Sequence, residues 1–78
     1  MREEIRGRGR VKFFRPGKGW GGIVSDDVPA DIWVHFSVIE MPGYKQLEED
    51  QMVEFRCIER QQDSWRYVAT WVGPLGPP

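Results

Sequence analysis

The sequence predicts an all-β fold, a small closed barrel built from five short strands. Two observations support this prediction. Five short segments have the alternating polarity, or the β-branched and aromatic composition, that is typical of strands. Nine glycines and six prolines in a chain of 78 residues provide tight turns between these segments. A chain of this length makes one domain, and closing its sheet into a barrel removes the unpaired strand edges.

The expected strands follow one another along the chain with turn signals between them. The first ends at Pro16-Gly17, and the second stops at an acidic turn before Pro29. The fourth has the clearest pattern, because Val53 and Phe55 alternate with charged residues. The five expected strands are residues 10–15, 20–25, 31–35, 51–59 and 64–72.

The first strand contains two adjacent phenylalanines that cannot both point inward. Val11 is expected to face the core and Lys12 the solvent, because successive side chains on a strand point to opposite faces. One of Phe13 and Phe14 must therefore lie near the solvent face, unless a bulge turns the chain.

The connections between the later strands are expected to be irregular. Residues 36–39 are too few for a stable α-helix and are expected to form one helical turn. From this turn, Val38 and Ile39 would cap one end of the core. Residues 40–50 are expected to form a loop, and residues 60–63 a polar, hairpin-like connection.

The two ends of the chain differ in composition from its middle. We expect a flexible basic N-terminal arm over residues 1–8, the barrel over 9–72 and a Pro/Gly-rich tail over 73–78. The later arm residues are also compatible with the start of the first strand. The glycine-spaced arginines suit non-specific phosphate contacts, or form a solvated end that does nothing. The tail suits an extended segment, and only weakly a polyproline-type ligand, because proline supplies no N–H to a sheet.

The net charge of −1 averages two unlike halves. Residues 1–20 carry seven Lys/Arg and two Glu, which gives +5, whereas residues 21–78 carry four Lys/Arg and ten Asp/Glu, which gives −6. A basic edge of this kind favours an acidic partner, although chance clustering in an arm would look the same.

The cysteine content and the hydrophobicity indicate a cytoplasmic protein. Cys57 is the only cysteine, so it has no partner for an intramolecular disulfide or a zinc site, and it is interpreted as a small buried hydrophobe. No apolar segment approaches the roughly 20 residues needed to span a bilayer. The charged N-terminus is not followed by an apolar segment, so we expect no signal peptide.

Two neighbouring strands are expected to display aromatic and basic side chains on one face. Ile32 and Val34 share one side of the third strand, and Trp33 and His35 share the other side. If the aliphatic sides are buried, the solvent face carries Lys18, Trp20, Trp33 and His35. Exposed tryptophans of this kind suit a stacking platform for unpaired bases.

The order and spacing of several motifs resemble the cold-shock domain family. The matching segments are Val11-Lys12-Phe13-Phe14, Lys18-Gly19-Trp20-Gly21, residues 31–37, Gly43-Tyr44-Lys45 and residues 47–53. The resemblance implies a five-stranded antiparallel OB-fold barrel that binds single-stranded RNA or DNA with little sequence specificity. Its bacterial members act as RNA chaperones that influence transcription and translation. The nucleic-acid-binding residues it implies are Lys12, Phe13, Lys18, Trp20, Trp33, His35, Phe36 and Tyr44.

The sequence departs from the family pattern at the centre of the implied platform. The family usually has an aromatic residue where this chain has Gly22, so we expect a gap there and binding roughly 5- to 150-fold weaker if nothing fills it. On this expectation, Gly22→Phe strengthens binding. Trp65 and Trp71 of the fifth strand are also unusual for the family and are interpreted as packing or edge-covering residues.

Two other classes of function remain in view. An enzyme is not expected, because the one histidine has no nucleophile or carboxylate at a telling spacing, and the sequence indicates no metal, cofactor or small-molecule substrate. A protein-interaction module that uses the exposed aromatic face is the main alternative, since Trp and Tyr dominate such interfaces. We expect a monomer that does not bind membranes.

Overall fold

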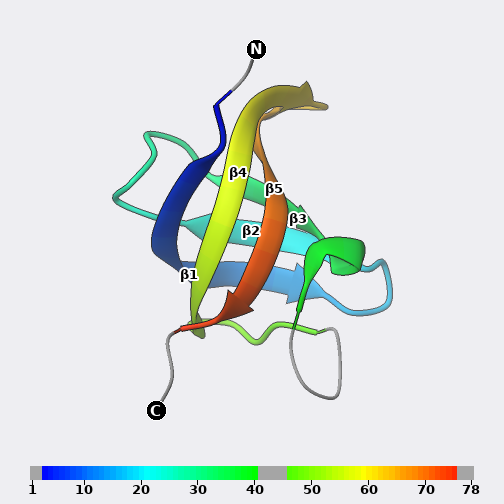
Figure 1. Cartoon of the computed structure of the whole chain (residues 1–78). Helices are drawn as coiled ribbons and strands as arrows, with labels where there is room; N and C mark the ends of the chain where they lie inside the picture. Colours follow the sequence, from blue (N-terminus) through cyan, green and yellow to red (C-terminus); the bar gives the residue numbers. More distant parts are fainter. Residues whose placement is uncertain (1–2, 41–45, 76–78) are drawn as a thin grey trace.

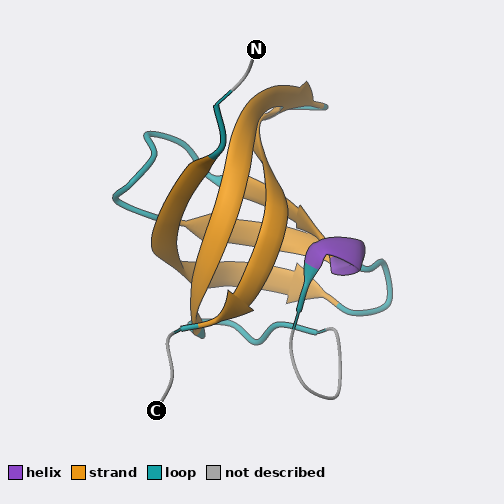
Figure 2. Ribbon diagram, in the orientation of Figure 1, coloured by secondary structure: helices purple, strands orange, loops and turns teal. Residues whose placement is uncertain are grey.

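The computed structural model describes residues 3–40 and 46–75, which form a closed five-stranded barrel (Figures 1 and 2). The elements are β1 (Ile5–Arg15), β2 (Trp20–Val24), β3 (Ile32–His35), the 3-10 helix η1 (Phe36–Val38), β4 (Met52–Gln62) and β5 (Trp65–Pro74). The predicted barrel and its single helical turn are therefore confirmed for the described residues. No helix in these ranges is long and apolar enough to cross a membrane.

The strands follow the order β1-β2-β3-β5-β4 around the barrel, and β4 returns to β1. The pairing of β3 with β5 is parallel, and the other pairings among the described strands are antiparallel. A closed ring with an odd number of strands cannot alternate in direction all the way round. The expectation of an antiparallel barrel is thus refined by one parallel pair at the closure.

β1 begins at Ile5, inside the segment expected as an arm, and its first half pairs with β4 from Ile5↔Cys57 to Arg10↔Met52. Two of its inward positions there are Gly7 and Gly9, and the third is Ile5, which packs against the core. A Cβ at Gly7 would lie 2.8 Å from the Phe55 ring. The strand is hard to recognise in the sequence because Gly7 and Gly9 carry no apolar side chain at inward positions.

A bulge in β1 resolves the two adjacent phenylalanines. The register with β2 shifts between Val11 and Phe13. Val11 is fully buried, Phe14 packs against the core, and Phe13 lies opposite Gly22 of β2. The bulge therefore turns Phe13 to the outside of the barrel, near the rings of Trp20 and Trp65.

The β4–β5 hairpin is longer than the sequence indicated. Residues 60–62 belong to β4, so the predicted connection over residues 60–63 is wrong. The turn is confined to Asp63 and Ser64, and Asp63 adopts a left-handed φ of 52°. Polar residues continue the ladder here because the hairpin tip extends beyond the barrel core (Figure 1). β5 likewise runs past residue 72 to pair Pro74 with Val53.

The core is a single cluster of mostly aliphatic side chains inside the barrel. Ile39 is fully buried and Val38 packs against the cluster, which confirms that the turn after β3 caps the core. The buried members are Val11, Ile23, Val28, Ile32, Val34, Ile39, Leu47, Val53, Phe55, Cys57, Tyr67, Ala69 and Val72.

Candidate nucleic-acid interface

The predicted alternation of β3 is confirmed. Ile32 and Val34 are fully buried, whereas Trp33 and His35 are partly exposed. β2 pairs with β3 so that Trp20 lies opposite His35. The aliphatic sides of both strands thus hold the outward side chains in fixed positions on the barrel surface.

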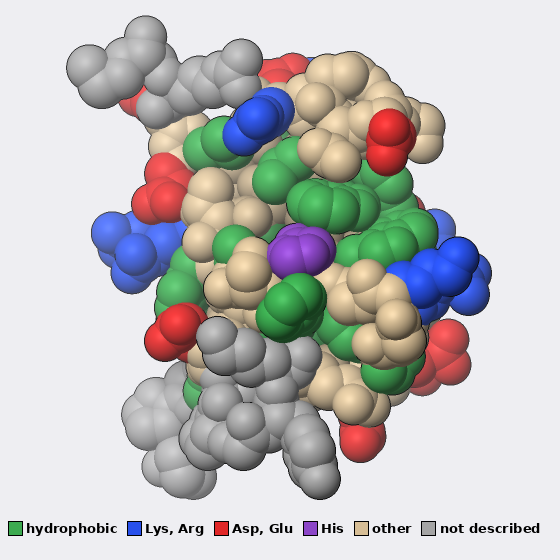
Figure 3. All heavy atoms as spheres, turned by 90° about the vertical axis from the view of Figure 1, so that its right-hand side faces the viewer, with side chains coloured by type: hydrophobic (Ala, Val, Ile, Leu, Met, Phe, Trp, Pro, Cys, Tyr) green, Lys and Arg blue, Asp and Glu red, His purple; other side chains and the backbone are tan. Residues whose placement is uncertain are grey.

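Trp33, His35 and Phe36 form a ladder of rings along one edge of this surface. The Trp33 and His35 rings are stacked, with centroids 5.8 Å apart and an interplanar angle of 24°. The His35 and Phe36 centroids are 4.6 Å apart. Phe36 is 45% exposed. Figure 3 shows the histidine in purple among green hydrophobic side chains, with basic side chains near both margins of the view.

His35 also caps η1. Its Nδ1 accepts a hydrogen bond from the backbone N–H of Ser37 at 3.3 Å, and Ser37 Oγ lies 2.8 Å from the same nitrogen. Because Nδ1 accepts, the neutral ring carries its proton on Nε2. The cap therefore fixes the ring plane and leaves Nε2–H as the hydrogen-bond donor of His35.

Phe36 is seated on the turn between β1 and β2. Its backbone N–H donates to the carbonyl of Gly19 at 2.8 Å. A Cβ at Gly19 would lie 2.9 Å from the Phe36 ring, and Gly19 has a φ of 76°, so both space and backbone geometry require glycine here. These contacts hold the outermost ring of the ladder.

A second group of rings lies beside the ladder and contains a residue that the sequence analysis did not include in the site. The centroids of Phe13 and Trp20 are 5.6 Å apart. Trp65, from the start of β5, lies 6.1 Å from Phe13 and 6.3 Å from Trp20. We call the six residues Phe13, Trp20, Trp33, His35, Phe36 and Trp65 the aromatic face.

The expectation that no ring lies at the centre of the platform is wrong. A Cβ at Gly22 would be 2.8 Å from Cη2 of Trp65 and 3.0 Å from Cε1 of Phe13. The Trp65 ring thus occupies the space into which a side chain at position 22 would project. The signal in the sequence was the coincidence of a missing ring at Gly22 with an unusual tryptophan in the fifth strand.

Lys18 and Arg15 lie close to the aromatic face, and Lys12 precedes Phe13 on β1. Lys12 Nζ forms an ion pair with Asp31 at 2.9 Å. Lys18 is exposed and lines a shallow groove with Phe36, and no ion pair to Lys18 is found within residues 3–40 and 46–75. The guanidinium of Arg15 lies 5.5 Å from the centroid of Phe13, a position that the sequence analysis missed.

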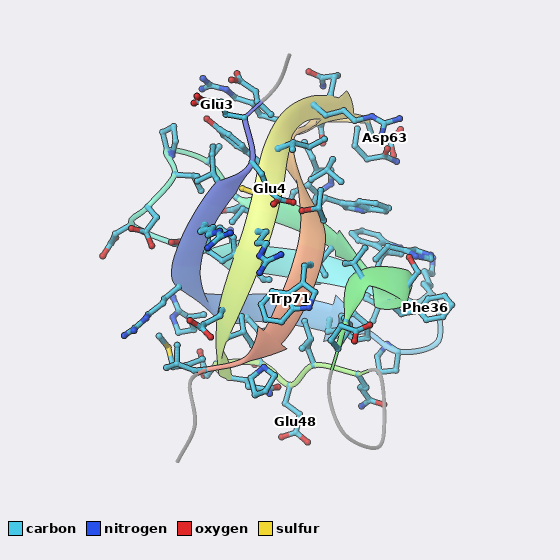
Figure 4. The ribbon with its side chains drawn as sticks, viewed as in Figure 1. Glu3, Glu4, Phe36, Glu48, Asp63 and Trp71 are labelled. Carbon is cyan, nitrogen blue, oxygen red and sulfur yellow. The ribbon has the colours of Figure 1, made fainter. Side chains whose placement is uncertain are left out.

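The structure brings together six of the eight residues predicted for the site, and a seventh, Lys12, adjoins Phe13 in the chain. The eighth, Tyr44, lies outside the described residues. Trp71 lies elsewhere, on the outside of β4 and β5, apart from Phe36 (Figure 4). Its indole carries the guanidinium of Arg56 at 5.3 Å from the ring centroid.

Neither a metal centre nor a reactive thiol is apparent in the part of the chain that the structure describes. No group of three or more His, Cys, Asp or Glu there could hold a metal ion. Burial, with a smaller contribution from the Glu4 carboxylate, raises the pKa of the Cys57 thiol from 9.0 to about 11. Cys57 is therefore a protonated, fully buried side chain at neutral pH.

Comparisons with known proteins agree on one family. The family described as 'Cold-shock' DNA-binding domain matches residues 7–67. A cold shock-like protein of Aquifex aeolicus is 48% identical over 52 residues, which cover 67% of this chain and 74% of that protein. Cold shock-like protein CspD of Haemophilus influenzae is 45% identical over 56 residues, with coverage of 72% and 78%. Cold shock-like protein CspC of Bacillus cereus is 50% identical over 52 residues, with coverage of 67% and 78%.

Proposed function

This chain belongs to the 'Cold-shock' DNA-binding domain family, and on that premise we propose that it binds single-stranded RNA or DNA by stacking bases on its aromatic face. The proposed contacts are Lys12, Phe13, Lys18, Trp20, Trp33, His35, Phe36 and Tyr44.

The ladder of Trp33, His35 and Phe36 is the observation that carries this proposal. Its rings follow one another at 5.8 and 4.6 Å. The first two lie on the outside of β3, whose other side is buried, and the third lies on η1. Rings held in this way lose little conformational freedom on binding, so a base that stacks on them costs little ordering entropy. Each base stacked on an aromatic side chain is worth about 1–3 kcal/mol.

The same chemistry supports low sequence specificity. Every base has a π-face, so stacking tolerates any of them, and a lysine or arginine beside the rings contacts phosphate without regard to sequence. The exposed Lys18 and Arg15 flank the rings, and the Nε2–H of His35 supplies one donor for a base or a phosphate. In a duplex the base faces are stacked on one another, so a duplex would contact only the basic side chains beside the rings.

The decisive experiment titrates the protein with an unstructured, pyrimidine-rich oligonucleotide at low salt. Tryptophan fluorescence is expected to be quenched at micromolar concentration, because three of the four tryptophans belong to the aromatic face. A duplex of the same sequence is the matched control and should bind more weakly. Absence of quenching by the single strand would refute the proposal.

Salt dependence separates this function from a protein-interaction module that uses the same face. Binding to a single strand releases counterions, so its affinity should fall as salt rises. Binding of a peptide through the aromatic face should change little with salt. A salt-independent complex with a protein, together with no affinity for oligonucleotides, would favour the interaction module.

The wider role that we propose is that of a monomeric RNA chaperone, or a regulator of transcription or translation, in the cytoplasm. The free, buried Cys57 suits a reducing compartment. A binder of unpaired bases favours open RNA over hairpins by mass action. Opening of a hairpin RNA that carries a fluorophore and a quencher measures this activity, and light scattering measures the oligomeric state.

A further inference from the structure

The Trp65 ring, which comes from β5, occupies the space over Gly22 of β2. Gly22 of β2 lies opposite Phe13 of β1 and opposite Trp33 of β3. A side chain at this central position would stand between the two neighbouring rings. Gly22 supplies none, and Cη2 and Cζ3 of Trp65 would lie only 2.8 and 3.2 Å from its missing Cβ.

The β4–β5 hairpin holds Trp65 in that place. Gln62 pairs with Trp65 across a turn of two residues, in which Asp63 is left-handed with a φ of 52°. Two residues further along β5, Tyr67 is 4% exposed and belongs to the core. Trp65 is partly exposed instead, and its ring is nearly perpendicular to that of Trp20, at 85°. The ring is thus fixed against its neighbours without being sealed from solvent.

We propose that Trp65 is a nucleic-acid-binding residue that stacks an unpaired base above Gly22. The inference rests on the proposed function and adds to it a contact supplied by β5. Gly22 and Trp65 form a matched pair, since the absence of a side chain on β2 makes room for the indole from the hairpin. A bound nucleic-acid strand therefore meets the Trp65 ring at this point instead of the bare backbone of β2.

Four variants test the pair through the anisotropy of a fluorescein-labelled oligonucleotide, which is independent of the protein's own tryptophans. Trp65→Ala is expected to weaken binding roughly 5- to 150-fold, the loss of one stacked base. Trp65→Phe should retain most of the affinity. Gly22→Phe alone should not strengthen binding, because its Cβ would collide with the Trp65 ring at 2.8 Å. Gly22→Phe combined with Trp65→Ala should recover much of the affinity that Trp65→Ala loses.

Trp71→Ala is the matched control, because it removes another partly exposed indole from the same strand away from the aromatic face. Its affinity is expected to stay within about twofold of the wild type, the scatter typical of a distant surface change. If Trp65→Ala unfolds, the test rests on Trp65→Phe and on the double variant. The reference is then Trp33→Ala, which lacks one ring of the aromatic face. A double variant that folds but binds no better than Trp33→Ala overturns the pair.

The outcomes also separate this inference from the function on which it rests. Unchanged affinity in Trp65→Ala, alongside weakened binding in Trp33→Ala, would overturn the role of Trp65 and leave the proposed function intact. A wild-type protein that binds no oligonucleotide would overturn both.

Discussion

Two tryptophans of β5 each lie over a glycine, and their surroundings differ. Trp65 lies over Gly22 among the rings of the aromatic face. Trp71 lies against Gly73 and carries the guanidinium of Arg56 at 5.3 Å from its centroid. Figure 4 shows Trp71 in front of β4 and β5, apart from Phe36 at the side of the barrel. We call the second region, formed by Arg6, Arg8, Arg56 and Trp71 together with Glu54 opposite Arg8, the arginine face.

The groups around a surface tryptophan determine whether its ring is available to a ligand. On the arginine face, Arg6 lies opposite Arg56 across β1 and β4, and like charges in that position repel. Trp71 offsets part of this repulsion through its cation–π contact, so its ring already has a partner. On the aromatic face the rings contact mainly one another. Only the aromatic face therefore offers several rings to a ligand.

Both faces are held by the same barrel core, and alkaline pH should lower the free energy of unfolding of that core. The pKa of Cys57 is about 11 in the folded protein, above its ordinary value of 9.0. Unfolding releases the thiol to ionise, so the stability due to the protonated thiol is fully present below pH 9 and is lost as pH rises through 11. The expected loss in the free energy of unfolding is about 2–3 kcal/mol.

Urea unfolding at several pH values between 8 and 11 measures this loss. Cys57→Ala is the control, because the other titrating groups remain in it. We expect a shallower fall in the unfolding midpoint for this variant. Parallel curves for the two proteins would show that Cys57 does not contribute to the alkaline sensitivity.

Truncating one ring of the aromatic face separates its role in binding from its role in stability. Trp33→Ala is expected to weaken oligonucleotide binding by about 1–3 kcal/mol, because it removes one end of the ring ladder. Its melting temperature should change little, since Trp33 is partly exposed on the outside of β3. Anisotropy titrations and thermal melts measure the two effects. Normal affinity with a large loss of stability would show that Trp33 only packs against the barrel.

Much of this arrangement could be predicted from residue patterns. Ile32 and Val34 alternate with Trp33 and His35, and this period of two was enough to assign the faces of β3. The unusual Trp65 and the missing ring at Gly22 were visible in the sequence. Their contact could not be predicted from strand periodicity, because it depends on the curvature of a hairpin whose tip residues, such as Gln62, are polar (Figure 1). The first half of β1 was left open between an arm and a strand, since two of its inward positions, Gly7 and Gly9, carry no side chain that would mark a strand.

Removing one cation from each face should have the smallest effect on binding. The salt dependence of the two variants tests whether nucleic acid contacts only the aromatic face. Lys18→Gln removes an exposed cation beside Phe36, and Arg8→Gln removes one from the arginine face. Each phosphate contact on a single strand contributes about 0.7 to the slope of log affinity against log salt. We expect Lys18→Gln to lower the slope by this amount and Arg8→Gln to leave it unchanged. An equal reduction in both variants would mean that a bound strand continues from the rings onto the arginines, because counterions are released only where phosphates bind.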